Sequence, residues 1–170
     1  MLRVDLRELA QEGAALTRGE LRQDDPALDG IDITLKEPVA VGGRLQSLGD
    51  GRFYWQGTVR TVAQGECRRC LTAVATPVNL EIGALFTQDP EALDDPDSYA
   101  VAPDATEIDV TPAVREELIL AAPRYVLCRE DCEGYCPQCG QDLNAGPCGC
   151  APATDARWQP LKALKDKLSS

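Results

Sequence analysis

The sequence predicts an α+β fold, in which an antiparallel β meander or small open barrel carries one or two helices and a C-terminal cysteine-rich module. Apolar and polar residues alternate through most of the first half, which is the pattern of half-buried strands. Short turns join these runs and favour antiparallel pairing of consecutive strands. Six of the 8 cysteines lie between residues 128 and 150. With 170 residues and 44% apolar content, the chain is expected to form one domain of ordinary size with a small appendage.

The first predicted strands are short. Residues 2–6 alternate between apolar and polar, and residues 7–11 then favour a helical turn before Gly13. Residues 31–35 alternate again and stop before Pro38. We therefore expect a strand, a helical turn and a second strand in this part of the chain.

The next two strands are predicted to form a hairpin. Residues 39–48 indicate a strand in which the Gly42-Gly43 pair suggests a bulge or bend. The Asp50-Gly51 step is typical of a tight hairpin turn. The strand after the turn runs on into Cys67, and one of its faces is marked by Phe53, Trp55, Gly57 and Val59.

The clearest strand covers residues 74–86. Residues suited to a buried face occupy every second position and must share one side of the sheet: Val74, Thr76, Val78, Leu80, Ile82, Ala84 and Phe86. The Cys67-Arg-Arg-Cys70 motif lies between this strand and the preceding one. It is therefore expected at the tip of a hairpin, where a bound metal ion would pin two strands together.

One helix is predicted after the strands. Thr111 is expected to cap it, Pro112 to occupy its first position and Pro123 to end it. Its buried stripe is expected to contain Val114, Leu118, Ala121 and Ala122. A second short helix is predicted over residues 160–168, in a stretch that is basic overall.

The cysteine pattern predicts zinc binding. The Cys136-Pro-Gln-Cys139-Gly140 motif places two thiolates three positions apart, close enough to bind one tetrahedral Zn²⁺ if the chain turns tightly. Pro137 fixes a φ angle suited to that turn, and Gly140 permits a positive φ after it. Two structural Zn²⁺ ions are expected, with all the cysteines as ligands: Cys67, Cys70, Cys128, Cys132, Cys136, Cys139, Cys148 and Cys150.

The spacing leaves two partitions of these ligands open. In the favoured one, residues 136–150 supply four cysteines to one ion, while Cys67 and Cys70 meet Cys128 and Cys132 across the fold. The alternative is a single site formed by the four cysteines within residues 128–139. Two sites are favoured because an exposed pair of free thiols is a liability.

Disulfides and thiol redox chemistry are weaker interpretations. The N-terminus lacks the apolar stretch of an export signal, so a cytoplasmic location is expected, and there disulfides are rare. A redox dithiol at Cys67 and Cys70 would use Arg68 and Arg69 to lower a thiol pKa. However, such a motif belongs at a strand-to-helix turn, whereas both flanks here are predicted strands.

The chain is acidic, with a formal net charge of −11. This charge argues against simple, sequence-independent binding of nucleic acid. Most of it lies in segment 81–117, which contains Arg115 as its only basic residue. Residues 88–98 contain two prolines and no periodicity, and are predicted to be a mobile loop. That loop is either a solvated spacer or an acidic surface for a basic partner.

Three segments together resemble the bacterial YceD family of large ribosomal RNA subunit accumulation proteins. They are Cys67-Arg-Arg-Cys70-Leu71 before a long strand, the helical segment 114–123 after an acidic spacer, and the cysteine run 127–150. The resemblance covers the chain from about residue 50 onwards. It implies a non-enzymatic role in the accumulation of large-subunit (23S) ribosomal RNA and in ribosome biogenesis, in the cytoplasm.

Two kinds of partner remain open, namely the large-subunit ribosomal RNA itself or a basic ribosomal protein escorted by the acidic segment. Direct RNA contact is expected to use the arginines beside the cysteines, which are Arg68, Arg69, Arg124 and Arg129. Their alternative role is to offset the charge of the metal–thiolate centres. The basic tail would add Arg157, Lys162, Lys165 and Lys167.

The sequence favours a non-enzymatic protein. It contains no histidine and no phosphate-binding Gly-rich loop, and a site with four cysteine ligands leaves no position for a reacting water. Neither a membrane nor a small-molecule substrate is expected as a partner. The predicted organisation is a β domain over residues 1–123, a zinc module over 124–150 and a short helix within 151–170.

Overall fold

A computed structural model describes residues 2–94, 97–150 and 157 of the chain. Its elements are β1 (Arg3–Asp5), α1 (Leu6–Glu12), β2 (Ala14–Leu21), η1 (Pro26–Leu28), β3 (Thr34–Leu35), β4 (Val39–Gly49), β5 (Arg52–Glu66), β6 (Ala73–Thr87), η2 (Pro90–Asp94), β7 (Ser98–Ala100), β8 (Glu107–Asp109) and α2 (Thr111–Leu120). The predicted helix over residues 160–168 lies outside the described residues, and the proposed division of the chain into three parts remains a prediction.

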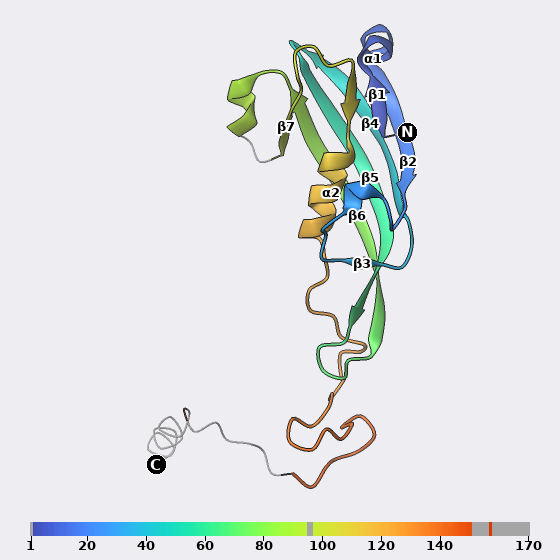
Figure 1. The fold of residues 1–170 in the computed structure, drawn as a ribbon, viewed down its shortest axis with the longest axis vertical. Coiled ribbons are helices and arrows are strands. Elements are labelled where there is room, and N and C mark those ends of the chain that lie inside the picture. Colours follow the sequence, from blue (N-terminus) through green and yellow to red (C-terminus); the bar gives the residue numbers. More distant parts are fainter. Residues whose placement is uncertain (1, 95–96, 151–156, 158–170) are drawn as a thin grey trace.

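The predicted α+β class is confirmed, and the sheet is an open one. Strands β2, β4, β5 and β6 pair antiparallel in that order, and β7 adds to β6 in parallel. The short strand β3 pairs with β5 beyond the segment that pairs with β4. Strands β1 and β8 form a separate antiparallel pair. Figure 1 shows the long β5–β6 hairpin extending beyond the rest of the sheet towards residues 128–150.

Both long strands bury the predicted faces. In β5 the alternate residues from Trp55 to Ala63 are buried, and in β6 Val78, Ile82, Ala84 and Phe86 are buried. Helix α2 lies against β6 and buries Ala113, Val114 and Leu118. The core is therefore enclosed between one face of the sheet, α2 and the β1–β8 pair.

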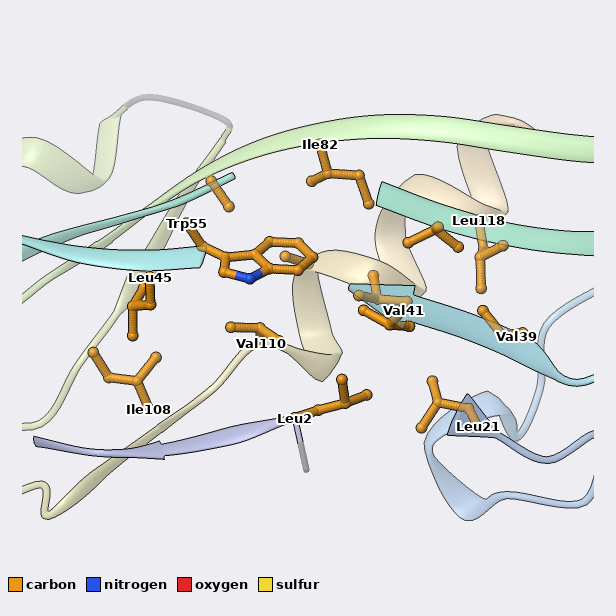
Figure 2. Close-up of a cluster of buried hydrophobic side chains, with 14 of the residues drawn as sticks. Leu2, Leu21, Val39, Val41, Leu45, Trp55, Ile82, Ile108, Val110 and Leu118 are labelled. Carbon is orange, nitrogen blue, oxygen red and sulfur yellow. The ribbon is translucent and has the colours of Figure 1, made fainter. Parts of the chain in front are cut away.

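Trp55 occupies the centre of this core. Its side chain is fully buried, and in Figure 2 the indole lies between Ile82 and Val110. The indole Nε1–H donates a 2.8 Å hydrogen bond to the buried hydroxyl of Thr17 on β2. This bond satisfies the only polar group of the indole and ties the first long strand to the centre of the sheet.

The Gly42-Gly43 pair does not form the predicted bulge. Both glycines keep an unbroken register with β2 and with β5, and the irregularity in β4 lies instead between Ser47 and Gly49. Gly43 is required for space, since a Cβ atom there would lie 2.7 Å from the Trp55 Nε1. The Asp50-Gly51 turn is confirmed, with φ angles of 52° and 66° that match a type I′ hairpin.

Three other expectations need correction, and one strand was missed. Only residues 34 and 35 of the predicted strand 31–35 pair with the sheet. Strand β2 was not predicted, because its segment shows little alternation. Helix α2 is capped by Val110 rather than Thr111, and the Asp109 carboxylate instead accepts from the Thr111 N–H. The acidic loop contains the 3-10 helix η2, and β7 begins at its end.

No helix within the described residues is long and apolar enough to cross a membrane.

Candidate metal centres

The structure gathers the eight thiols into two groups of four. In each group all four Sγ atoms lie within 4.8 Å of one another. The groups are Cys67, Cys70, Cys128 and Cys132, and Cys136, Cys139, Cys148 and Cys150. This grouping follows the favoured partition, whereas the alternative set within residues 128–139 is divided between the two groups.

The sulfur spacing in the first group fits a tetrahedral metal ion. A Zn–S bond of about 2.3 Å places neighbouring sulfurs of a tetrahedron about 3.8 Å apart. The Cys67 and Cys132 Sγ atoms are separated by 3.8 Å, and those of Cys70 and Cys128 by 3.5 Å. All eight cysteines are free of disulfides. The donor set therefore fits a metal that prefers four thiolates, such as zinc.

The two Cys-x-x-Cys motifs adopt the same backbone turn. The Leu71 N–H donates to the Cys67 carbonyl, and the Gly140 N–H donates to the Cys136 carbonyl, each over 2.9 Å. The residue after the second cysteine is left-handed in both turns, with φ of 56° at Leu71 and 74° at Gly140. Glycine suits this conformation, whereas leucine is disfavoured there, so the fold around the first turn imposes it.

The first turn lies at the tip of the β5–β6 hairpin, as predicted, and contacts residues 124–135. The Arg68 N–H donates to the Val126 carbonyl, and the Tyr135 N–H donates to the Arg69 carbonyl, both over 3.0 Å. The Arg69 guanidinium donates to the Cys132 carbonyl over 2.6 Å. These bonds and the four thiols join segments that are more than 50 residues apart in the sequence.

The second group closes on itself through local contacts. The Cys136 N–H donates to the Gln141 carbonyl over 2.8 Å, and Tyr135 forms an isolated antiparallel bridge with Asp142. Asn144 connects the two groups, because its side-chain oxygen accepts from the Glu133 N–H and from the Arg129 guanidinium. The second group is more exposed than the first, with Cys136 as its only buried member.

Thiols held this close influence one another's ionisation. Burial opposes ionisation of Cys67, but hydrogen bonds from the N–H groups of Arg69, Cys128 and Cys70 outweigh it and lower the pKa of Cys67 to about 6. Hydrogen bonds from the N–H groups of Cys139 and Gln138 likewise lower the pKa of Cys136 to about 6.

In each group a neighbouring thiol has a raised pKa instead. The pKa of Cys128 is raised to about 12, chiefly by hydrogen bonding with the Cys70 side chain. The pKa of Cys150 is also raised to about 12, chiefly by hydrogen bonding with the Cys139 side chain. Four thiolates at these distances repel one another, so all four can ionise together only beside a cation.

Three of the four arginines expected to contact RNA make contacts within the protein. The Arg68 guanidinium lies 5.4 Å from the centre of the Tyr125 ring, and Arg69 binds backbone carbonyls. Arg129 pairs with Asp131 over 3.2 Å and also binds Asn144. Among the described residues, Arg124 has no side-chain hydrogen bond or ion pair, and it lines a hollow beside the end of α2.

Sequence reasoning missed the contacts that hold the first turn in place. The Arg69–Cys132 and Arg68–Tyr125 contacts join distant segments, and no spacing along the chain indicates them. Gly134 carries a partial signal, since its φ is 77° and a Cβ atom there would lie 2.5 Å from the Arg69 carbonyl oxygen. Gly134 therefore marks the point where its backbone meets that of Arg69.

The family model of YceD, described as large ribosomal RNA subunit accumulation protein YceD, matches residues 55–165. That range contains all eight cysteines and both long strands of the hairpin from Trp55 onwards. The match therefore includes both candidate metal centres as well as the centre of the β core.

Curated relatives cover most of the chain. An uncharacterized protein of Mycobacterium tuberculosis is 30% identical over 93% of this chain and 78% of its own length. The chloroplastic large ribosomal RNA subunit accumulation protein YCED homolog 1 of Zea mays is 24% identical over 92% of this chain and 59% of its own length. Its counterpart in Arabidopsis thaliana is 26% identical over 66% of this chain and 44% of its own length. No solved structure matches the chain.

Proposed function

Because the chain belongs to the YceD family of large ribosomal RNA subunit accumulation proteins, we propose that it is a non-enzymatic factor that supports accumulation of large-subunit ribosomal RNA and assembly of that subunit. The observation that carries this proposal is the family match over residues 55–165, which includes both four-cysteine groups. We place this activity in the cytoplasm, where the ribosomal RNA of a bacterium is made and assembled.

The proposed cofactor is a pair of structural Zn²⁺ ions, one in each group of four cysteines. Four thiolates would satisfy a tetrahedral ion completely, so the sites would stabilise the fold without a coordination position for substrate. The first ion would join the hairpin tip to residues 124–135, and the second would hold residues 136–150 together. Thiolate ligands favour zinc over the hard cations, which prefer oxygen.

The absence of catalytic chemistry is part of the proposal. The chain has no histidine, and a closed four-thiolate site cannot present a metal-bound water. Adjacent Glu116 and Glu117 point in different directions on α2, and Glu116 accepts a 2.7 Å hydrogen bond from the Tyr99 hydroxyl. Glu116 therefore connects β7 to α2, and the two carboxylates do not converge on a substrate.

A second candidate function is escort of a basic ribosomal protein. The observation that favours it is the net charge of −11, with exposed carboxylates at Asp89, Glu91 and Asp104. Salt dependence separates the two functions in purified components. Direct phosphate contacts make the affinity for ribosomal RNA fall steeply as salt is raised, whereas an escort would show little RNA affinity at any salt concentration.

Deleting the gene is expected to lower the ratio of large-subunit to small-subunit ribosomal RNA, and a plasmid copy of the wild-type gene should restore it. The reason is that precursor RNA lacking its assembly factor is degraded before it enters subunits. The ratio would be measured from total RNA during exponential growth. An unchanged ratio in the deletion strain would contradict the proposed function, whichever partner the protein binds.

A further inference from the structure

The outer face of the sheet is exposed across four adjacent strands. Alternate residues of β2, β4, β5 and β6 point away from the core, and most of these residues are exposed. Helix α2 contacts β6, and the core residues of β4 and β5 lie on the opposite face. Within the described residues, no helix packs on this outer face.

This face is basic on a protein that is acidic overall. Arg18, Arg44 and Arg60 project from three neighbouring strands, and the register places Arg18 opposite Gly42 and Arg60 opposite Ala40. Three outward carboxylates lie on the four strands: Glu20 and Glu81 near these arginines, and Glu66 at the far end of β5, next to Cys67. A positive face is unexpected in a chain with a net charge of −11, so it calls for an anionic partner.

Two of these arginines are available to a ligand. Among the described residues, neither Arg44 nor Arg60 makes a side-chain hydrogen bond or an ion pair, and both are exposed. By contrast, Arg3 and Arg115 are held by contacts within the protein. Arg3 pairs with Glu107 and Asp109, and Arg115 binds two backbone carbonyls.

Small residues make the face hollow between the arginines. Arg18 and Arg60 line one hollow, Arg44 lines its neighbour, and Gly42 and Thr58 line both. A Cβ atom added at Gly42 would meet nothing within 4 Å, so the floor of the hollow is open to solvent. The arginines therefore stand at the sides of a shallow depression that crosses the strands.

An aromatic ring lies across the same face. Tyr54 is 40% exposed, and its hydroxyl lies so close to Gly83 that a Cβ atom there would be 2.4 Å from it. Since Gly83 lies on the neighbouring strand, opposite Gln56, the ring extends over the sheet rather than away from it. Exposed aromatic rings on a sheet surface stack with the bases of single-stranded nucleic acids.

We propose that the outer face of strands β2, β4, β5 and β6 binds single-stranded RNA. Arg18, Arg44 and Arg60 would contact the phosphates, and Tyr54 would stack with a base. Proteins recognise an RNA duplex by its regular backbone and shape, whereas an open sheet with an exposed aromatic ring suits unpaired bases. This inference rests on the proposed function, because it places the RNA contact of that function on the outer face of the sheet.

The phosphate contacts are tested by the double variant Arg44→Gln/Arg60→Gln. The probe is a fluorescent oligouridylate of about 12 nucleotides, measured by anisotropy over a series of salt concentrations. We expect a loss of affinity of about tenfold and a salt slope reduced by about 0.7 for each arginine. The control Arg7→Gln/Arg22→Gln removes the same charge from residues outside these strands and should bind within about twofold of wild type.

Tyr54 is tested separately, because stacking depends on the ring rather than on charge. Tyr54→Ala should weaken oligouridylate binding about tenfold with an unchanged salt slope, whereas Tyr54→Phe should keep wild-type affinity. Circular dichroism should show the same fold in each variant, because all of the replaced side chains are exposed.

The proposal is overturned if the wild-type protein does not bind the oligonucleotide, or if the face variants bind as well as the control. It is also overturned if a paired RNA duplex competes more strongly than the single strand. None of these results depends on the ratio of ribosomal RNAs in the deletion strain. Failure of the RNA-binding face is therefore distinguishable from failure of the proposed function.

Discussion

Replacing Cys132 by serine is expected to release one of two metal ions and to detach residues 124–135 from the hairpin tip. Cys132 is fully buried, and its Sγ lies 3.8 Å from that of Cys67. A structural zinc site contributes on the order of 10 kcal/mol to the fold that it holds. The hydrogen bonds that join the two segments are too few to replace that contribution, since each is worth about 1 kcal/mol.

Hydrogen exchange would measure this detachment directly. The amides of Arg68 and Tyr135 donate across the junction, to the Val126 and Arg69 carbonyls, and should lose their protection in Cys132→Ser. Amides in the centre of β5, such as that of Trp55, should remain protected and serve as the internal control. Retention of two ions, or unchanged exchange at Arg68 and Tyr135, would contradict a metal-held junction.

The second expected result is that Cys148→Ser removes only the other ion and unfolds residues 136–150 locally. This group is closed within 15 residues of sequence, and its links to the remainder are the Tyr135–Asp142 bridge and the contacts of Asn144. Since the first group does not depend on those links, it should keep its ion.

Exchange and mass measurements distinguish the local outcome from a cooperative one. In Cys148→Ser the Gly140 amide, which donates to the Cys136 carbonyl, should exchange rapidly while the Arg68 amide stays protected. The mass of the native protein should correspond to one ion. Loss of both ions from this variant would show that the two groups form one cooperative unit, contrary to the local closure described above.

The strands with strong alternation and the local turns were predictable, because the signals lie within a few residues. Alternation identified the buried faces of β5 and β6, and the Asp50-Gly51 step identified the turn between β4 and β5. The preferred grouping of cysteines also followed from spacing, since a four-thiol set can close within residues 136–150 while Cys67 and Cys70 need distant partners.

Features that depend on tertiary contact were not predictable from the sequence. Strand β2 has little alternation, and its place depends on pairing with β4 and on the Thr17–Trp55 hydrogen bond. The Gly42-Gly43 pair suggests a bulge or bend, but Gly43 is needed because the indole of Trp55 lies against it. Only the folded sheet brings Arg18, Arg44 and Arg60 to one face, because they lie on three separate strands.

Native mass spectrometry of the purified protein, combined with alkylation of its thiols, tests the central claim most directly. Two closed four-thiolate centres predict a mass increase of two Zn²⁺ per chain and eight thiols that react only after a chelator is added. Chelation should then release both ions and expose the thiols to the reagent. One ion with four readily alkylated cysteines, or a protein without bound metal whose thiols all react at once, would contradict the claim.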